Sequence, residues 1–278
     1  MPLAPTDLLG KRGAVLFHYT SLERAIEDIL PSMTLKTSPF AEMRDPRESK
    51  DWGPTTAGFT DSDNHDAEDR RYWELYRCLN DLKRSCRLLS FTEDDPDPMT
   101  RDYGRGFARP RLWEQYGGAH KGICLCFDRA ALIRSMEAEF SGDLFFRHGA
   151  VEYLDERLFR ELSFDASVLA ESIDLESIIA KHLETHWKSF FFTKLTDWST
   201  EREYRFLLRR LDPAAVFVDM TDSLRAICMG PDLADPYYPA LAALCAPSGI
   251  HVRKLIWQNN EPLTMGIQIE SPAAITPN

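Results

Sequence analysis

The sequence predicts an α+β fold in which a mixed or antiparallel β-sheet carries helical insertions. Segments with the two-residue periodicity of strands occur along the whole chain, and segments with helical spacing separate them in no regular order. Of the 278 residues, 44% are hydrophobic, which is enough for a substantial buried core. From this length we expect one domain over residues 1–278, either a single large domain or a domain with a helical insertion, and the chain contains no internal repeat.

Each expected element follows from its local pattern. A strand at 14–21 leads into a helix at 22–30, which Ser21 caps and Pro31 ends. Further strands are expected at 33–37, 87–92, 123–128, 149–153, 201–208, 215–219, 224–230 and 251–257. Further helices are expected at 72–87, 129–140, 158–192 (largely helical) and 235–244. Residues 38–69 have the composition of a loop, and we expect a frayed tail at 271–278.

The charge and the cysteines indicate the setting of the protein. With a net charge of −11, the chain is not expected to bind nucleic acid or an anionic membrane through its overall charge, although 33 Lys and Arg residues allow a local basic groove. No apolar run is long enough to span a bilayer, and residues 1–7 lack the features of a secretory signal. Six cysteines without a C-x-x-C pair predict reduced core thiols in a cytoplasmic protein.

The stretch from 194 to 208 contains two glutamates one residue apart, Glu201 and Glu203, followed by Arg205. On a strand these three side chains share one face. Two like charges side by side need a positive group, which Arg205 or a cationic transition state would supply. Two plainer interpretations stay open: a solvated strand, or a helix start in which Thr200-x-x-Glu203 forms a capping box. A carboxylate in this place could stabilise an oxocarbenium-like sugar carbon.

The end of the first strand carries the polar sequence His18-Tyr19-Thr20. A histidine at a strand end can hydrogen-bond ribose hydroxyls or a phosphate, and a tyrosine can stack on a planar ring. The plainer alternative is a strand end with a packed aromatic ring and a turn hydroxyl.

Two further segments hold candidate binding residues. On the strand at 87–92, Ser90 and Thr92 share one face, as they would also do on an ordinary edge strand. Trp113, Tyr116 and His120 would share a helical face and form an aromatic wall, with core packing as the alternative.

A metal site is not expected. His182 and His186 are one helical turn apart, but the zincin pattern requires Glu after the first His, and Leu183 stands there. The sequence also contains no Walker A loop, no G-x-G-x-x-G and no G-x-S-x-G nucleophile elbow.

Five motifs together resemble the bacterial family called domain of unknown function 2971, over about residues 14–210. Arg44 departs from the family pattern, which usually has Asn before Asp-Pro. The motifs are Phe17-His18-Tyr19-Thr20-Ser21, Asp45-Pro46-x-Glu48, Leu89-Ser90-Phe91-Thr92, Trp113-x-x-Tyr116-x-x-x-His120-Lys121-Gly122 and Lys194-x-x-x-Trp198-x-x-Glu201-x-Glu203-Tyr204-Arg205.

More distantly, the chain resembles the ADP-ribosyltransferases, which split the nicotinamide–ribose bond of NAD. The resemblance implies the fold of that family, with NAD as substrate. It implies that Glu203 is the catalytic carboxylate and that Glu201 orients the acceptor. The residues that it implies for NAD binding are His18, Tyr19, Thr20, Ser90, Thr92 and Tyr116, with His18 holding the ribose and Tyr116 stacking on nicotinamide.

The expected function is therefore an NAD-dependent ADP-ribosyltransferase or NAD glycohydrolase with an unspecified acceptor. Such enzymes in bacteria often serve as toxins or in defence against phage, which the resemblance implies for this chain. Two alternatives stay open. One is a non-catalytic module that binds a nucleotide or a protein, and the other is a metal-dependent hydrolase that uses Asp45 and Glu48.

Overall fold

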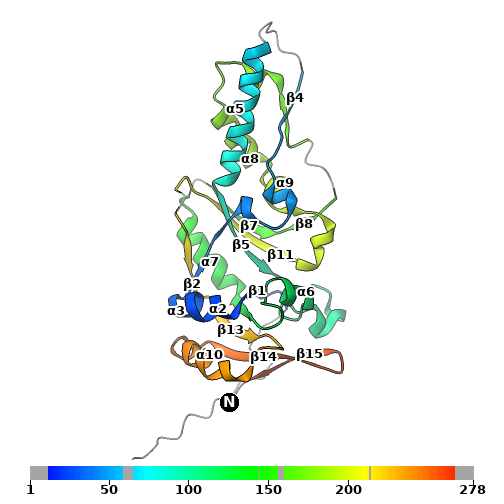
Figure 1. Cartoon of the computed structure of the whole chain (residues 1–278), viewed down its shortest axis with the longest axis vertical. Helices are drawn as coiled ribbons and strands as arrows, with labels where there is room; N and C mark the ends of the chain where they lie inside the picture. Colours follow the sequence, from blue (N-terminus) through cyan, green and yellow to red (C-terminus); the bar gives the residue numbers. More distant parts are fainter. Residues whose placement is uncertain (1–11, 59–64, 144, 156–159, 213, 267–278) are drawn as a thin grey trace, which may run out of the picture. The chain divides into compact units, whose positions relative to one another are not determined.

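The computed structural model describes the chain except residues 1–11, 59–64, 144, 156–159, 213 and 267–278 (Figure 1). The fold is mixed α+β with mostly antiparallel strand pairs, as predicted. The chain forms two compact units, which we describe separately. Unit 1 comprises Met1–Lys36, Phe91–Glu139 and Phe217–Asn278, and unit 2 comprises Thr37–Ser90 and Phe140–Val216. The expectation of one domain over 1–278 stays a prediction, and the expected frayed tail lies outside the described residues.

The central strands of unit 1, β1, β6 and β13, are largely buried, and the strands of this unit pair mainly antiparallel. Strand β6 lies between β1 and β13, antiparallel to both, and β14 pairs parallel with β13 and antiparallel with β15. A separate pair joins β2 to β12. The bounds are β1 Val15–Thr20, β2 Thr34–Lys36, β6 Ile123–Asp128, β12 Phe217–Asp219, β13 Leu224–Met229, β14 His251–Gln258 and β15 Glu261–Gly266.

The helices of unit 1 include those expected near 22–30, 129–140 and 235–244 and some that the sequence pattern did not predict. The bounds are α2 Leu22–Arg24, the π-helical η1 Ala25–Ile29, α3 Leu30–Ser32, η3 Pro98–Gly104, α6 Pro110–Gln115, α7 Arg129–Phe140, η6 Asp235–Tyr237, α10 Tyr238–Cys245 and η7 Ala246–Ser248. Ser21 caps the first helix through Arg24 N, as predicted. The helix does not end at Pro31 but reaches Ser32, because Leu30 N–H bonds the carbonyl of Ala25 in a π-helical turn that accommodates the proline.

Unit 2 contains strand β11, which begins at Glu203, the second glutamate of the stretch 194–208; this stretch is called the glutamate motif below. Strand β11 pairs antiparallel with β7 and neighbours β5, whose last two residues belong to unit 1. Short pairs join β3 to β5, β4 to β9 and β8 to β10. The bounds are β3 Ser38–Pro39, β4 Thr55–Ala57, β5 Cys86–Thr92, β7 Phe145–Ala150, β8 Glu152–Tyr153, β9 Ser163–Asp165, β10 Thr193–Lys194 and β11 Glu203–Arg209.

The helices of unit 2 cover an aromatic core formed by Phe40, Trp52, Phe190 and Phe191. Helix α5 packs beside α8 (Figure 1). The bounds are η2 Phe40–Glu42, α4 Pro46–Ser49, α5 His65–Arg84, η4 Ala166–Leu169, α8 Leu175–Thr185, α9 Trp187–Phe191 and η5 Thr196–Glu201.

Two expectations for unit 2 need correction. The region 158–192, expected to be largely helical, contains β9 and the short η4 before α8 and α9, because Asp165 and Asp174 each cap a new element through a backbone N–H. The segment 38–69, expected to be a loop, contains short elements, among them α4 with Asp45 as its cap.

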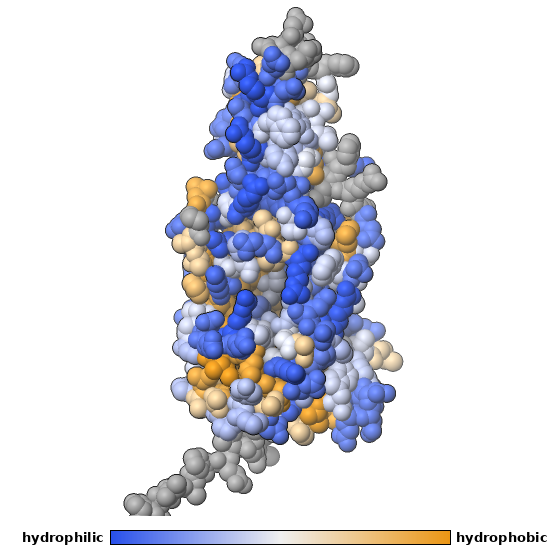
Figure 2. All heavy atoms as spheres, viewed as in Figure 1, coloured by the Kyte–Doolittle hydropathy of each residue, from blue (hydrophilic) through white to orange (hydrophobic). Residues whose placement is uncertain are grey.

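The surface differs in character from place to place. Apolar side chains gather on the visible face of unit 1 near α3 and α10, whereas the visible face of α5 in unit 2 is mainly hydrophilic (Figure 2). No helix among the described residues is long and apolar enough to span a membrane.

Candidate functional site

The glutamate motif lies in a buried cluster of charged side chains within unit 2. Each of the five members of the cluster is at most 6% exposed. They come from four separate elements, α4, β10, η5 and β11. The members are Glu48, Lys194, Glu201, Glu203 and Arg205.

The backbone at the motif differs from the uninterrupted strand that we expected. Glu201 ends the 3₁₀ helix η5, Arg202 has the left-handed φ of 45°, and β11 begins at Glu203. The expected strand face of Glu201, Glu203 and Arg205 is therefore wrong for Glu201, because the left-handed residue breaks the alternation. The two alternatives, a solvated strand and a helix start at Thr200, are not observed either.

Two cations hold the glutamates together. Lys194 Nζ lies 2.7 Å from Glu201 Oε2 and 2.9 Å from Glu203 Oε2. Arg205 binds Glu203 in a bidentate manner, with Nε 2.6 Å from Oε1 and Nη2 2.9 Å from Oε2. The same Nη2 also donates to Glu48 Oε1, and Arg205 Nη1 donates to the carbonyl of Phe191 at 2.6 Å. Glu201 and Glu203 thus meet through Lys194 although only one of them is on the strand.

Two aromatic residues complete the surroundings of the cluster. The ring of Trp198 lies 4.9 Å from Lys194 Nζ, a cation–π distance. The backbone N–H of Glu203 donates to the hydroxyl of Tyr153 at 2.8 Å. The motif spacing Lys194-x-x-x-Trp198 therefore has a direct structural meaning, since it places an aromatic ring against the buried lysine.

The surroundings shift the pKa values of two carboxyl groups of the cluster in opposite directions. Burial would raise the pKa of Glu203, but the cations of Arg205 and Lys194 outweigh it and lower this pKa to about 2. For Glu48, burial dominates and raises the pKa despite the neighbouring Arg205. Burial would also lower the pKa of Lys194, but the charge of Glu203 raises it above its ordinary value. Glu203, Lys194 and Arg205 are therefore ionised at neutral pH.

Ser90 lies near Glu203 in unit 2. It lies on β5, the neighbour of β11, and a hydrogen bond from its side chain is among the causes that lower the pKa of Glu203. The pairing of these strands thus joins two candidate residues that are far apart in the sequence.

The other candidate residues belong to unit 1. His18 is half-buried, and its ring centroid lies 5.6 Å from that of Phe91. Tyr19 is 8% exposed, donates its hydroxyl to the Gly106 carbonyl at 2.5 Å, and meets the ring of Trp113 edge-on at 5.0 Å. Thr20 and Thr92 are buried, and the half-buried Tyr116 caps α6 against the same core.

The expected helical face of Trp113, Tyr116 and His120 is wrong, because α6 ends at Gln115 and His120 lies in the tight turn that follows. This turn packs against the end of β1. Gly118, Ala119 and His120 all have left-handed φ values. A Cβ on Gly122 would lie 2.2 Å from the carbonyl oxygen of Thr20, and one on Gly117 would lie 2.5 Å from the ring of Trp113. Only glycine fits at these two positions, which explains the glycines of this motif.

Three members of the charged cluster are not among the residues that the sequence indicated for NAD chemistry: Arg205, which was expected as a counter-charge, and Lys194 and Glu48, for which no role was expected there. All three stand in motifs that resemble the family, so the motif positions themselves were the available signal. Glu48 is 157 residues from Arg205, and no local pattern indicates that the two side chains meet.

No group of three His, Cys, Asp or Glu side chains suited to a metal ion occurs within the described residues. The rings of His182 and His186 lie 4.6 Å apart, and His182 Nε2 is 2.5 Å from the Glu161 carbonyl oxygen. Burial lowers the pKa of His182. This histidine pair therefore packs within the helical part of unit 2.

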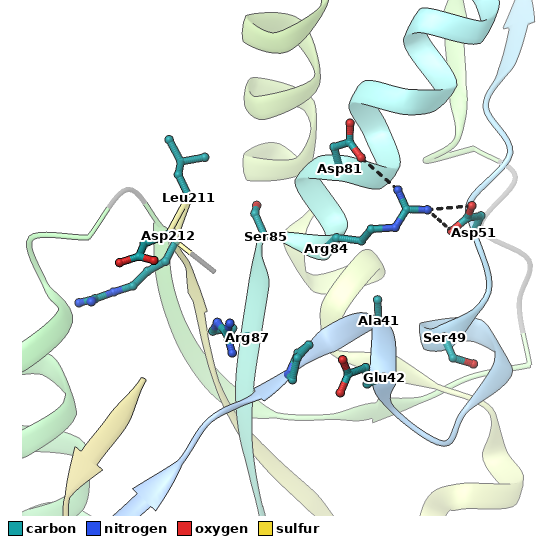
Figure 3. A pocket seen from close by; sticks show the side chains of 12 residues that line it. Ala41, Glu42, Ser49, Asp51, Asp81, Arg84, Ser85, Arg87, Leu211 and Asp212 are labelled. Carbon is teal, nitrogen blue, oxygen red and sulfur yellow. Dashed lines mark hydrogen bonds and ion pairs between the residues drawn. The ribbon is translucent and has the colours of Figure 1, made fainter. Parts of the chain in front are cut away.

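A groove of about 530 Å³ also lies in unit 2, at the end of α5 (Figure 3). Arg84 on its wall is held by Asp51 at 2.9 Å and Asp81 at 3.0 Å. None of the candidate site residues lines this groove. Its lining consists of Pro39, Ala41, Glu42, Ser49, Asp51, Asp81, Arg84, Ser85, Arg87, Arg210, Leu211 and Asp212.

Comparison with known families supports part of the resemblance. No curated protein and no solved structure matches the chain in the corresponding comparisons. Residues 112–206 match the model of the family described as protein of unknown function (DUF2971), so this segment, which carries the Trp113 motif and most of the charged cluster, is similar to that family.

Proposed function

We propose that the chain is an NAD-dependent ADP-ribosyltransferase or NAD glycohydrolase in which Glu203 is the catalytic carboxylate. The observation that carries the proposal is the state of Glu203: it is ionised and lies beside Ser90 on the neighbouring strand. This is the combination of residues that the resemblance to ADP-ribosyltransferases implies.

The chemistry requires a fixed negative charge. Cleavage of the nicotinamide–ribose bond builds positive charge on the ribose carbon as neutral nicotinamide departs, and a carboxylate stabilises that charge. Glu201 shares Lys194 with Glu203, and its proposed role of orienting the acceptor rests on the resemblance. The roles of His18, Tyr19, Thr20, Thr92 and Tyr116 in holding NAD rest on the resemblance and stay predictions.

The burial of Glu203 sets a condition for this proposal. The residue is 5% exposed, and both of its oxygens are ion-paired. A ribose hydroxyl must therefore replace one of these contacts when substrate binds. Lys194 is the replaceable partner, because it keeps Glu201 when it releases Glu203.

A second candidate is a module that binds a nucleotide or a protein without turnover. One observation favours it: Glu203 and Glu201 are already neutralised by Lys194 and Arg205, as in a purely structural ion network. The six cysteines are all free, which supports a reducing, cytoplasmic setting for either function.

One experiment separates the candidates. The purified chain is incubated with NAD, nicotinamide release is followed by mass spectrometry, and the melting temperature is measured with and without NAD. The transferase or hydrolase proposal expects release by the wild type, loss of release in Glu203→Gln, and unchanged release in Glu184→Gln, whose carboxylate is exposed. All variants are assayed at a temperature at which they are folded.

The possible outcomes have distinct meanings. Stabilisation by NAD without release of nicotinamide would favour the binding module. Neither stabilisation nor release would overturn the NAD proposal. Release that persists in Glu203→Gln would overturn the assignment of the catalytic carboxylate.

A further inference from the structure

The buried cluster contains more acidic than basic groups. Glu48, Glu201 and Glu203 share the two cations of the cluster, Lys194 and Arg205, with Arg205 contacting both Glu48 and Glu203. Because a buried, uncompensated charge is very costly, one carboxyl group is expected to bind a proton more strongly than the others.

The hydrogen bonds identify which carboxyl group this is. Both oxygens of Glu203 are ion-paired, and Glu201 contacts Lys194 directly. Glu48 contacts Arg205 through Oε1 alone, while its Oε2 is buried and has no hydrogen-bond partner among the described residues. An ionised oxygen in this position would lose its hydration without compensation, whereas a protonated one carries no charge.

We propose that Glu48 is the proton-carrying carboxyl group of the cluster and a positioning residue that holds Arg205 against the ionised Glu203. Burial raises the pKa of Glu48, which agrees with this geometry. The charged groups that act on it are Arg205 and Glu203 on β11 and Lys194 on β10. Lys83 on α5 also interacts with it electrostatically, and Asp45 caps the same turn.

The protonated state has a structural consequence. Neutral Glu48 still accepts the Arg205 hydrogen bond through Oε1. The positive charge of the guanidinium then interacts mainly with the carboxylate of Glu203. When Glu48 ionises, Arg205 is attracted to two carboxylates at once, and the buried Oε2 of Glu48 carries charge without a hydrogen-bond partner among the described residues. This inference goes beyond the proposed function, because it concerns the charge state of the folded protein and requires no NAD.

The direct test is a carboxyl titration of the folded protein by carbon-13 NMR with labelled glutamate. The Glu48 signal is assigned as the one missing from Glu48→Gln. We expect its titration midpoint to lie above that of Glu203 and above the ordinary pKa of glutamate. A Glu48 midpoint at or below the ordinary pKa of glutamate would overturn the proposal, whatever the outcome of the NAD assay.

A second measurement uses the neutral isostere. Gln at position 48 keeps a carbonyl oxygen for Arg205 and carries no charge, so Glu48→Gln should melt within about 3 °C of the wild type at neutral pH. Glu203→Gln removes an ionised partner of both cations and should melt about 10 °C lower. Equal losses in the two variants would contradict a neutral Glu48, and Glu48→Ala should be less stable than Glu48→Gln because it loses the bond to Arg205.

Discussion

The two units hold their sequence motifs together by different forces. In unit 2, residues from separate elements meet through buried ion pairs around Glu203. In unit 1, the end of β1 and the turn after α6 meet through close backbone packing, with Gly122 where a side chain would not fit. A change of charge should therefore affect unit 2 in a pH-dependent way, whereas added volume should affect unit 1 at every pH.

The largest effect is expected from Arg205→Met. This change leaves Glu203 and Glu48 without their shared cation in the core, which should cost about 4 kcal/mol of unfolding free energy. Urea denaturation measures the loss. The matched control is Arg84→Met, whose side chain is 49% exposed and pairs with surface aspartates, with an expected cost below about 1 kcal/mol. Equal losses of unfolding free energy in Arg205→Met and Arg84→Met would show that the buried ion pairs stabilise the fold no more than the surface ones.

The next effect concerns acid stability. Because the pKa of Glu203 is lowered to about 2, the unfolded state binds this proton first as the pH falls. The stabilisation is therefore present above the ordinary pKa of glutamate and is lost as the pH falls toward 2, with a total of about 3 kcal/mol. The difference in unfolding free energy between the wild type and Glu203→Gln, measured from neutral pH down to the pKa of Glu203, should shrink by this amount. A constant difference would show that Glu203 is not stabilised by its ion pairs.

Added volume in unit 1 should have a smaller effect. Gly122→Ala places a Cβ 2.2 Å from the Thr20 carbonyl oxygen, and the required shift of backbone should cost about 2 kcal/mol. The cost should be the same in acid and at neutral pH. Gly142→Ala is the control, since a Cβ there meets nothing within 4 Å, and its effect should stay below about 1 kcal/mol. A strong pH dependence of the Gly122→Ala effect would contradict the idea that backbone packing, and not ion pairing, holds this part of unit 1 together.

The smallest effect is expected from Glu48→Gln. The raised pKa of Glu48 means that the folded state retains the proton to higher pH than the unfolded state. The wild type therefore loses stability relative to Glu48→Gln as the pH rises through this range. The variant should lie within about 1 kcal/mol of the wild type below the ordinary pKa of glutamate and gain relative to it at higher pH. If Glu48→Gln instead lost unfolding free energy relative to the wild type as the pH rises, the pKa of Glu48 would not be raised in the folded state.

Part of this organisation was predictable from local patterns. The β1 strand and the Ser21 cap follow from alternation and from helix-start chemistry, and both are observed. The association of Ser90 with Glu203 was expected from the resemblance. The exclusion of Glu201 from the strand face was not predictable, because no local sequence pattern around Arg202 indicates its left-handed backbone.

The sequence by itself determined which residue types are present in the cluster and in what order. Its motifs placed Lys194, Glu201, Glu203 and Arg205 within one short stretch, and its period-two pattern put Glu203 and Arg205 on one strand face. Only the tertiary structure decided the charge balance. Glu48 comes from a position 157 residues away, and its burial beside Arg205 raises its own pKa. The physical reason is that pKa values depend on burial and on neighbouring charges, which only chain folding brings together.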